Sequence, residues 1–152
     1  MSERVDHPAV HLPPPLIFAA FFFAGLLMQR WLPVHIPYGR PTGVVLVIVA
    51  IAIATWGLLT MHRVRTGIIP HHPATELVAR GPFAFSRNPL YVSLTCAYIG
   101  AALWFSAIPA LILLPITIAV LQLFVIRREE AYLERRFGDA YRAYRANVRR
   151  WL

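Results

Sequence analysis

Three long apolar runs account for most of the chain, and the charged residues lie between and after them. None of these runs contains a charged residue, and they extend over Leu12–Gln29, Pro41–Met61 and Asn88–Ile126. A helix needs roughly 20 residues to cross the hydrocarbon of a bilayer. The first two runs therefore predict one transmembrane helix each.

The third run is about twice as long as one crossing requires. Ser106, Pro109 and Pro115 interrupt it, and proline disfavours a helix interior. We therefore expect a tight hairpin of two helices that turns near Phe105–Pro109. The expected spans are about 13–32, 42–61, 89–105 and 108–126, with a polar loop at 62–88 and a polar C-terminal segment at 127–152.

Composition supports the same class. The chain has 152 residues, of which 58% are hydrophobic and 14% are charged. Soluble domains carry about 25% charged residues, so we expect one all-α membrane domain over 1–152. Glu3 and Asp6 beside Arg4 do not form the basic leader of a secretory signal, so the first run is expected to remain as a helix.

Arginine distribution predicts the orientation in the membrane. All 15 basic residues are arginine, and eight of them follow Ile126. Only Arg30 and Arg40 lie in the first loop, and the predicted hairpin turn has none. The positive-inside rule then places both termini and the 62–88 loop in the cytoplasm, which predicts a protein of the bacterial cytoplasmic (inner) membrane.

The net charge of +8 indicates which kinds of partner the protein binds. These arginines lie within reach of the bilayer, so we expect membrane lipids as partners and no nucleic acid. Cys96 is the only cysteine, which excludes an intramolecular disulfide and a thiolate metal site. His71 and His72 are adjacent and do not converge naturally on one ion, so no metal is expected.

The C-terminal segment has a helical pattern of its own. Apolar residues recur at steps of three and four, with arginine between them, at Leu133, Phe137, Tyr141, Tyr144, Val148 and Trp151. Such a stripe favours an amphipathic helix in the plane of the interface. We expect Gly138 to end one helix and Asp139 to cap the next, and we interpret 139–152 as an interfacial anchor.

The polar loop is long for so small a membrane protein, and long loops are more often functional than plain linkers. Gly81-Pro82 indicates a turn. Asn88-Pro89 resembles a helix start, with Asn88 as the N-cap and Pro89 at the first helical position. The N–H groups at such a start are available to an anion.

These polar motifs carry a family resemblance. The pattern comprises Leu77-Val78-x-x-Gly81-Pro82-Phe83, Arg87-Asn88-Pro89-x-Tyr91 and Glu129-Glu130-x-x-Leu133-x-x-x-Phe137-Gly138-x-x-Tyr141-x-x-Tyr144. It resembles the isoprenylcysteine carboxyl methyltransferase family and the wider set of bacterial phospholipid methyltransferases. The match covers roughly residues 70–150.

The resemblance implies S-adenosylmethionine-dependent methyl transfer to a lipophilic small molecule or lipid at the cytoplasmic membrane face. By analogy with the family, the cofactor-binding residues are Thr75, Glu76, Leu77, Val78, Phe83, Asn88, Pro89, Leu90, Tyr91 and Glu129. No Gly-x-Gly-x-x-Gly follows a strand pattern, which excludes a soluble Rossmann-type methyltransferase. No catalytic residue is assigned: Glu130, His71 and His72 are the candidate bases, and a carboxylate acceptor would need none.

Three positions depart from the family pattern. Asn88 stands where many relatives have a histidine, and an amide cannot titrate. Phe83 lacks the hydroxyl of a tyrosine, and Val125 occupies the position of an arginine that contacts the prenylated substrate. Two other classes of protein stay open on sequence alone: a non-catalytic membrane scaffold, and a haem- or quinone-associated protein that uses His62, His71 or His72.

Overall fold

The computed structural model describes residues 13–64 and 77–152, and every regular element in these ranges is helical. The elements are α1 (Pro14–Met28), a 3-10 turn (Gln29–Trp31), α2 (Gly39–Arg63), a 3-10 turn (Gly81–Ala84), α3 (Pro89–Trp104), α4 (Ile108–Leu121), a π-helical segment (Gln122–Ile126), α5 (Arg127–Phe137) and α6 (Asp139–Asn147). The predicted hairpin is confirmed, since only three residues separate α3 from α4.

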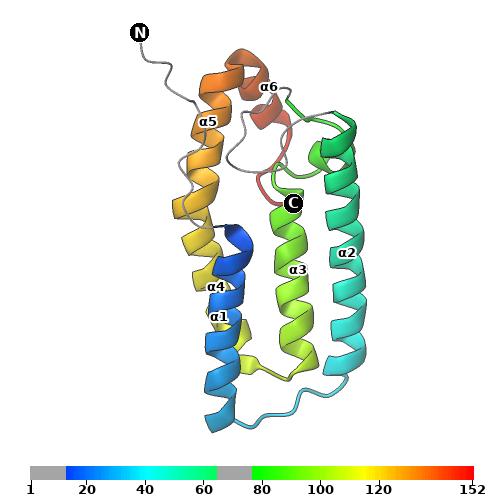
Figure 1. The fold of residues 1–152 in the computed structure, drawn as a ribbon, viewed down its shortest axis with the longest axis vertical. Coiled ribbons are helices and arrows are strands. Elements are labelled where there is room, and N and C mark those ends of the chain that lie inside the picture. The colour runs from blue at the N-terminus through cyan, green and yellow to red at the C-terminus, as the bar shows by residue number, and fades with distance from the viewer. Residues whose placement is uncertain (1–12, 65–76) are drawn as a thin grey trace.

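The bundle has the composition of a membrane protein. Three helical stretches are long and apolar enough to cross a bilayer, at Pro14–Trp31, Gly39–Arg63 and Ile108–Phe137. The fourth apolar helix, α3, is shorter, and Figure 1 shows it between the other helices of the bundle. The chain is therefore an all-α integral membrane protein, as expected from its hydropathy.

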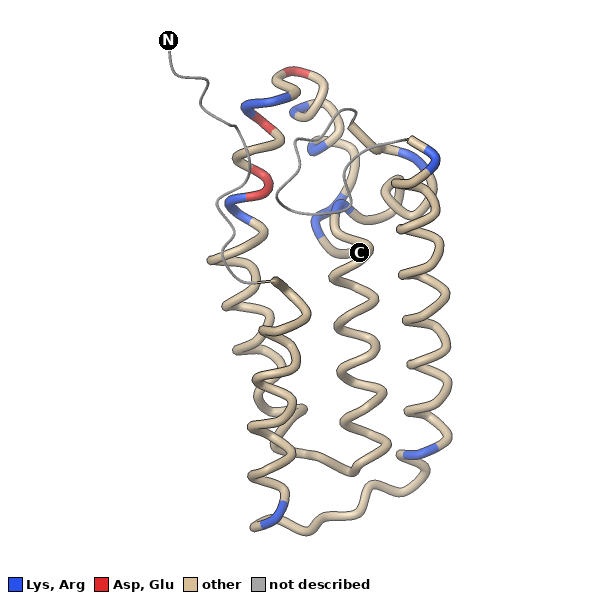
Figure 2. The backbone as a smooth tube through the Cα atoms, in the orientation of Figure 1, with Lys and Arg blue, Asp and Glu red and all other residues tan. Residues whose placement is uncertain are grey.

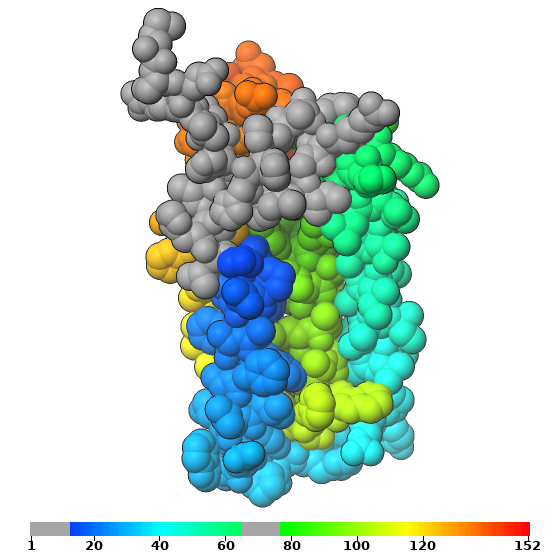
Figure 3. All heavy atoms as spheres, in the orientation of Figure 1, coloured from blue at the N-terminus to red at the C-terminus, as the bar shows by residue number. Residues whose placement is uncertain are grey.

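The helices form two close pairs, α1 with α4 and α2 with α3. The second pair is close enough that a Cβ atom on Gly43 would collide with the Gly100 carbonyl oxygen of α3. Small residues at such crossings let two membrane helices approach backbone to backbone. In Figure 3, side chains of α3 are visible between α1 and α2, so α3 lies at the centre of the bundle.

The main core lies among α1, α3 and α4. Phe18, Tyr98 and Leu121 are buried there, and the rings of Phe18 and Tyr98 meet edge to face at 6.0 Å between centroids. The Tyr98 hydroxyl donates to the Ala110 carbonyl oxygen at 2.8 Å, which ties α3 to α4. Packing and this buried hydrogen bond together fix the helix that carries the site residues.

The helices end at different levels at one end of the bundle. At 1.5 Å per residue, the 25 residues of α2 extend about 37 Å and the 16 residues of α3 only about 24 Å. Figure 1 shows that α2 and α5 rise well past the start of α3. The first turn of α3 therefore lies below the ends of its neighbours.

Charged residues gather at this same end (Figure 2). All four acidic residues of the described ranges lie in α5 and α6, at Glu129, Glu130, Glu134 and Asp139. The opposite end has arginine near the start of α2 and at the end of α1. This confirms that the motif before α3 and the motif after α4 emerge on one side of the bundle.

The C-terminal segment differs from the expectation in two ways. Asp139 is the first residue of α6 rather than its cap, and its side chain pairs with Arg142 at 2.6 Å. The helix also ends at Asn147, and Val148 is extended, so the predicted stripe does not continue through Trp151 as helix. Tyr141 is buried against the protein. The segment is thus packed onto the bundle as well as amphipathic.

Candidate functional site

The two motifs that flank the hairpin meet at a tyrosine and a carboxylate. The Tyr91 hydroxyl, in the first turn of α3, is 2.8 Å from Oε1 and 2.9 Å from Oε2 of Glu129 in α5. Glu129 is partly exposed, and within residues 13–64 and 77–152 the hydrogen-bond partner of its carboxylate is this hydroxyl. A carboxylate has about four acceptor positions, so most of its hydrogen-bonding capacity remains for a ligand.

A π-helical segment directly precedes this carboxylate. Helix α4 continues into α5 through Gln122–Ile126, and a π turn adds about one residue to the turn. One extra residue rotates all later side chains by about 100° around the helix axis. The rotation decides which side of α5 faces α3, and with it the position of Glu129. Such π segments are frequent at functional sites.

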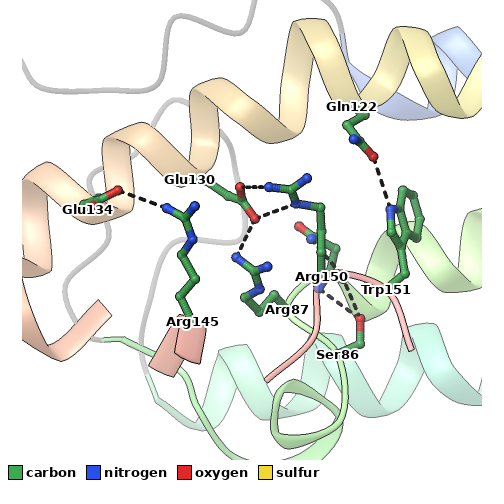
Figure 4. Close-up of polar contacts among 9 residues, drawn as sticks. Ser86, Arg87, Gln122, Glu130, Glu134, Arg145, Arg150 and Trp151 are labelled. Atoms are coloured by element: carbon green, nitrogen blue, oxygen red, sulfur yellow. Dashed lines mark hydrogen bonds and ion pairs between the residues drawn. The ribbon is translucent and has the colours of Figure 1, made fainter. Parts of the chain in front are cut away.

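The neighbouring acid, Glu130, has a different role. It is 7% exposed and binds two guanidinium groups (Figure 4). Arg87 Nη1 is 2.8 Å from Oε1, while Arg150 donates from Nε at 2.9 Å to Oε1 and from Nη2 at 2.6 Å to Oε2. The hydrogen bond to Glu130 raises the pKa of Arg150. The adjacent acids thus have different partners: Glu129 accepts from the Tyr91 hydroxyl, and Glu130 is held in an ion pair.

Backbone groups extend this ion pair into a larger assembly. Ser86 Oγ and Asn88 Nδ2 donate to the Arg150 carbonyl oxygen at 3.3 and 3.0 Å, and the Arg87 N–H donates to the Arg149 carbonyl oxygen at 2.9 Å. We call residues Ser86–Asn88, Glu130 and Arg149–Trp151 the C-terminal clasp. It joins the residues before α3, helix α5 and the end of the chain.

Asn88 occupies the predicted N-cap position, but its side chain does not cap α3. Its amide is used by the C-terminal clasp instead. Pro89 is the first residue of α3, as expected, and it is buried. The carbonyl of Asn88 accepts the N–H groups of Tyr91 and Val92 at 3.0 and 3.1 Å. The clasp therefore holds the start of α3, one turn from the Tyr91–Glu129 pair.

Phe83 lies in the 3-10 turn before α3 and is partly buried. Its carbonyl oxygen accepts the Tyr144 hydroxyl of α6 at 2.7 Å. Burial raises the pKa of Tyr144 to about 12, with further contributions from neighbouring Tyr141. Tyr144 is therefore a neutral donor at physiological pH, and it connects α6 to the turn that carries Phe83.

The other candidate site residues precede α3 in the chain or lie in its first turn. Leu77 and Val78 are partly buried in the irregular segment before the turn. Leu90 is directed toward α2, where a Cβ atom on Gly57 would meet its side chain. Thr75 and Glu76 lie outside the described residues. The structure thus brings Tyr91 together with Glu129 and Asn88 together with Arg150.

The candidate bases are Glu130, His71 and His72. Glu130 is engaged by two arginines, which argues against it as a base. His71 and His72 lie outside the described residues. Within residues 13–64 and 77–152 no three His, Cys, Asp or Glu side chains gather as a metal-binding group.

Sequence reasoning missed the contribution of the chain's end. It interpreted 139–152 as an anchor, whereas Arg150 is the principal partner of Glu130 and the Trp151 indole lies 3.4 Å from Gln122 Oε1 (Figure 4). The apolar spacing gives no signal for this contact, because Trp151 follows Val148 at the same step of three and Arg150 is one of eight arginines after Ile126. It does not identify a partner 20 residues earlier in the chain.

The charged end of this helical membrane bundle thus carries a carboxylate hydrogen-bonded to a tyrosine at the start of α3. The family model for phospholipid methyltransferases matches residues 39–140, which is 102 of the 152 residues. The chain belongs to this family and is, at that level, a membrane methyltransferase. The matched region runs from the start of α2 to the start of α6 and includes the motif before α3 and the second motif from Glu129 to Gly138.

One relative extends the comparison. An uncharacterized protein of Haemophilus influenzae is 44% identical over 63 residues, which are 41% of this chain and 100% of that protein. No solved structure matches the chain significantly.

Proposed function

We propose that the protein transfers a methyl group from S-adenosylmethionine to a lipophilic acceptor at the cytoplasmic face of the membrane. The observation that carries the proposal is the Tyr91–Glu129 pair at the first turn of α3, in a chain of the phospholipid methyltransferase family. The arginine-rich end of the bundle supports the cytoplasmic assignment.

The chemistry of Glu129 suits the cofactor. S-adenosylmethionine carries an ammonium group and a ribose diol, and both are donors that a carboxylate accepts through charge-assisted hydrogen bonds. The Tyr91 hydroxyl contacts both carboxylate oxygens and so orients the group without using its full capacity. Glu129 and Tyr91 are therefore the residues that we assign first to the cofactor site.

The remaining family positions complete the proposed site. Thr75, Glu76, Leu77, Val78 and Phe83 precede α3 and would line the cofactor from the side of the loop. Asn88, Pro89 and Leu90 form the start of α3, where helix N–H groups favour a carboxylate. Phe83 and Tyr91 supply aromatic faces suited to an adenine ring or a cation.

When bound, the cofactor supplies an electrophilic methyl group on a sulfonium centre. The chain's contribution is to orient the reactants and to exclude water, which accounts for much of the rate in such reactions. The C-terminal clasp serves this purpose, because it fixes the first turn of α3 relative to α5. A carboxylate acceptor needs no general base, whereas an amine or a thiol acceptor would need one.

A lipophilic acceptor fits the position of the first turn of α3. Because α3 is about 24 Å long and the hydrocarbon is about 30 Å thick, the start of α3 lies near the level where lipid tails meet headgroups. An acceptor with its tail in the bilayer would present its polar group at this level and enter laterally between helices.

Binding of S-adenosylhomocysteine in mild detergent tests the proposal. Glu129→Gln keeps the size of the side chain and removes its charge, so affinity should fall roughly ten- to a hundredfold. Glu134→Gln is the matched control, because Glu134 is five residues away and pairs with exposed Arg145. Equal affinities for all three proteins would remove Glu129 from the site, and a parent protein that does not bind would remove the proposed function.

A further inference from the structure

The π-helical segment Gln122–Ile126 gives the helix that leads to Glu129 a second possible arrangement. From Ile108 to Phe137 the chain is one continuous helix, and this segment interrupts its α-helical pattern. A π turn holds about one residue more than an α turn. When such a turn moves along a helix, each step exchanges one i→i+5 backbone hydrogen bond for one i→i+4 bond, so their number stays the same. The extra residue can therefore change its place while α4 keeps its position.

Moving the π turn from before Glu129 to beyond Glu130 exchanges the places of neighbouring side chains. The residues that the turn passes rotate by about 100° and advance by about 1.5 Å, which is the offset between successive residues of an α-helix. Glu129 then takes the present place of Glu130, and Arg128 takes the present place of Glu129. We call this arrangement the second register and the arrangement in the structure the first register.

The adjacent acids make the second register compatible with the C-terminal clasp. In the first register Glu130 is 7% exposed and pairs with Arg87 and Arg150 (Figure 4). Removing the carboxylate from such a buried pair is strongly destabilising, because it leaves an uncompensated charge. In the second register Glu129 brings an identical carboxylate to the same two guanidinium groups. The clasp therefore keeps its ion pair in both registers.

The residues before the two acids support the same exchange. Val125 and Ile126 are 1% and 0% exposed, and both are β-branched, so Val125 can take the place of Ile126 with little loss of packing. Ile126 would move to the present place of Arg127, which is exposed. Helix α5 packs mainly against α6 and the π-helical segment, whereas α4 packs against α1. Rotation of the first turns of α5 therefore leaves the paired helices of the bundle in place.

The Tyr91–Glu129 pair exists only in the first register. There the Tyr91 hydroxyl is 2.8 and 2.9 Å from the two carboxylate oxygens. In the second register an arginine takes the place of this carboxylate, and a guanidinium group has no acceptor for the hydroxyl. Its positive charge would also repel the ammonium group of S-adenosylmethionine or S-adenosylhomocysteine. The exchange thus removes the proposed partner of the cofactor.

We propose that the π-helical segment is a conformational switch that controls binding and release of the cofactor. The first register, with Glu129 at Tyr91, binds S-adenosylmethionine. The second register, with Glu129 in the place of Glu130, releases the product S-adenosylhomocysteine. The exchange of registers stands on the π-helical segment and the adjacent acids, whereas its link to the cofactor rests on the proposed function.

Labelling of a cysteine at position 126 measures the second register in the full chain. Ile126 is fully buried in the first register, so Ile126→Cys should react with N-ethylmaleimide through the second register. Cys96→Ala removes the natural cysteine from every variant. Deletion of Leu123, which is 49% exposed, removes the extra residue and leaves a continuous α-helix with α5 in its present orientation. Leu123→Ala is the matched control, because it truncates the same side chain and keeps the π turn.

The deletion should slow labelling at least about tenfold relative to Leu123→Ala, because it removes a minor state that in such equilibria has a population of about 0.1–10%. The melting temperature of each variant shows whether it folds. Equal labelling rates in the two variants would overturn the proposal in favour of local fraying. A cysteine that stays unlabelled in Leu123→Ala would also overturn it.

Glu129→Gln decides the question if the deletion variant does not fold. A neutral amide cannot replace the carboxylate between Arg87 and Arg150, whereas at Tyr91 it still accepts a hydrogen bond. The variant should therefore favour the first register, and its cysteine at position 126 should react more slowly than that of the parent. Faster or unchanged labelling would overturn the proposal, because a contact that only stabilises α5 would leave the cysteine more exposed when it is weakened.

S-adenosylhomocysteine tests the link to the cofactor. At about ten times its dissociation constant it should slow labelling of Ile126→Cys about tenfold, because it binds the first register alone. Binding that leaves the labelling rate unchanged would overturn the link. A parent protein that does not bind S-adenosylhomocysteine would remove the proposed function instead, and the two Leu123 variants would still decide the exchange of registers.

Discussion

Neutralising Glu130 should destabilise the protein more than any other single change of charge in the described residues. Glu130 is 7% exposed, and the side chains of its partners Arg87 and Arg150 are 11% and 28% exposed. In Glu130→Gln, Arg87 keeps its burial and loses its counter-ion. Breaking a buried pair in this way costs about 3–5 kcal/mol. Because Arg150 reaches solvent, we expect a loss in free energy of unfolding near the lower limit, about 3 kcal/mol.

Arg150→Gln is a milder perturbation of the same assembly. Glu130 then keeps its ion pair with Arg87. The variant loses the two hydrogen bonds from the partly exposed Arg150 guanidinium, which contribute at most about 1.5–3 kcal/mol to the free energy of unfolding. Glu134→Gln is the control, since its partners Arg142 and Arg145 are exposed and such pairs contribute about 0–1 kcal/mol. The expected order of destabilisation is therefore Glu130, then Arg150, then Glu134.

Unfolding by titration with a denaturing detergent in mixed micelles measures these free energies. The double variant Glu130→Gln/Arg150→Gln closes a thermodynamic cycle, and residues in one ion-pair network should show a coupling of about 0.5–3 kcal/mol. Because the C-terminal clasp holds the start of α3, both single variants should also bind S-adenosylhomocysteine more weakly than Glu134→Gln. A Glu130→Gln protein as stable as Glu134→Gln, or a coupling near zero, would refute the reasoning.

Three further predictions address the bundle, the C-terminal segment and the orientation. Gly43→Val should lower the thermal stability by about 1–3 kcal/mol because it separates α2 from α3, whereas exposed Ala52→Val should not. The folded-state pKa of Tyr144 is raised from 10.0 to about 12. Its contribution to the free energy of unfolding is therefore complete below pH 10 and is lost as the pH rises through about 12. Alkaline unfolding should accordingly be less steep in Tyr144→Phe. Reporter fusions after Leu32 and Ser106 should be periplasmic and one at the C-terminus cytoplasmic, and a periplasmic C-terminus would contradict the orientation.

The pattern of apolar residues determined the helices of this protein because hydropathy is a local property. The span expected at 89–105 is observed at Pro89–Trp104, and the turn expected near Phe105–Pro109 lies between α3 and α4. A closed hairpin must return its ends to one side of the bundle. The sequence therefore also predicted that Tyr91 and Glu129 would lie at the same end.

Motif matching named candidate site residues but could not assign partners among them. Glu129 and Glu130 are adjacent and chemically alike, yet one accepts from Tyr91 and the other binds Arg87 and Arg150. Which of them faces which partner depends on the rotation of α5. The π segment at Gln122–Ile126 sets that rotation, and its residues have no spacing that distinguishes them from an ordinary helix.

The return of the chain's end to the site was likewise decided only by tertiary structure. Arg150 reaches Glu130 because the chain reverses at Gly138, where φ is +51°, and becomes extended after Asn147. A helical repeat in sequence reports that a segment has an apolar face. It does not report what covers that face, because burial depends on contacts between residues far apart in the chain.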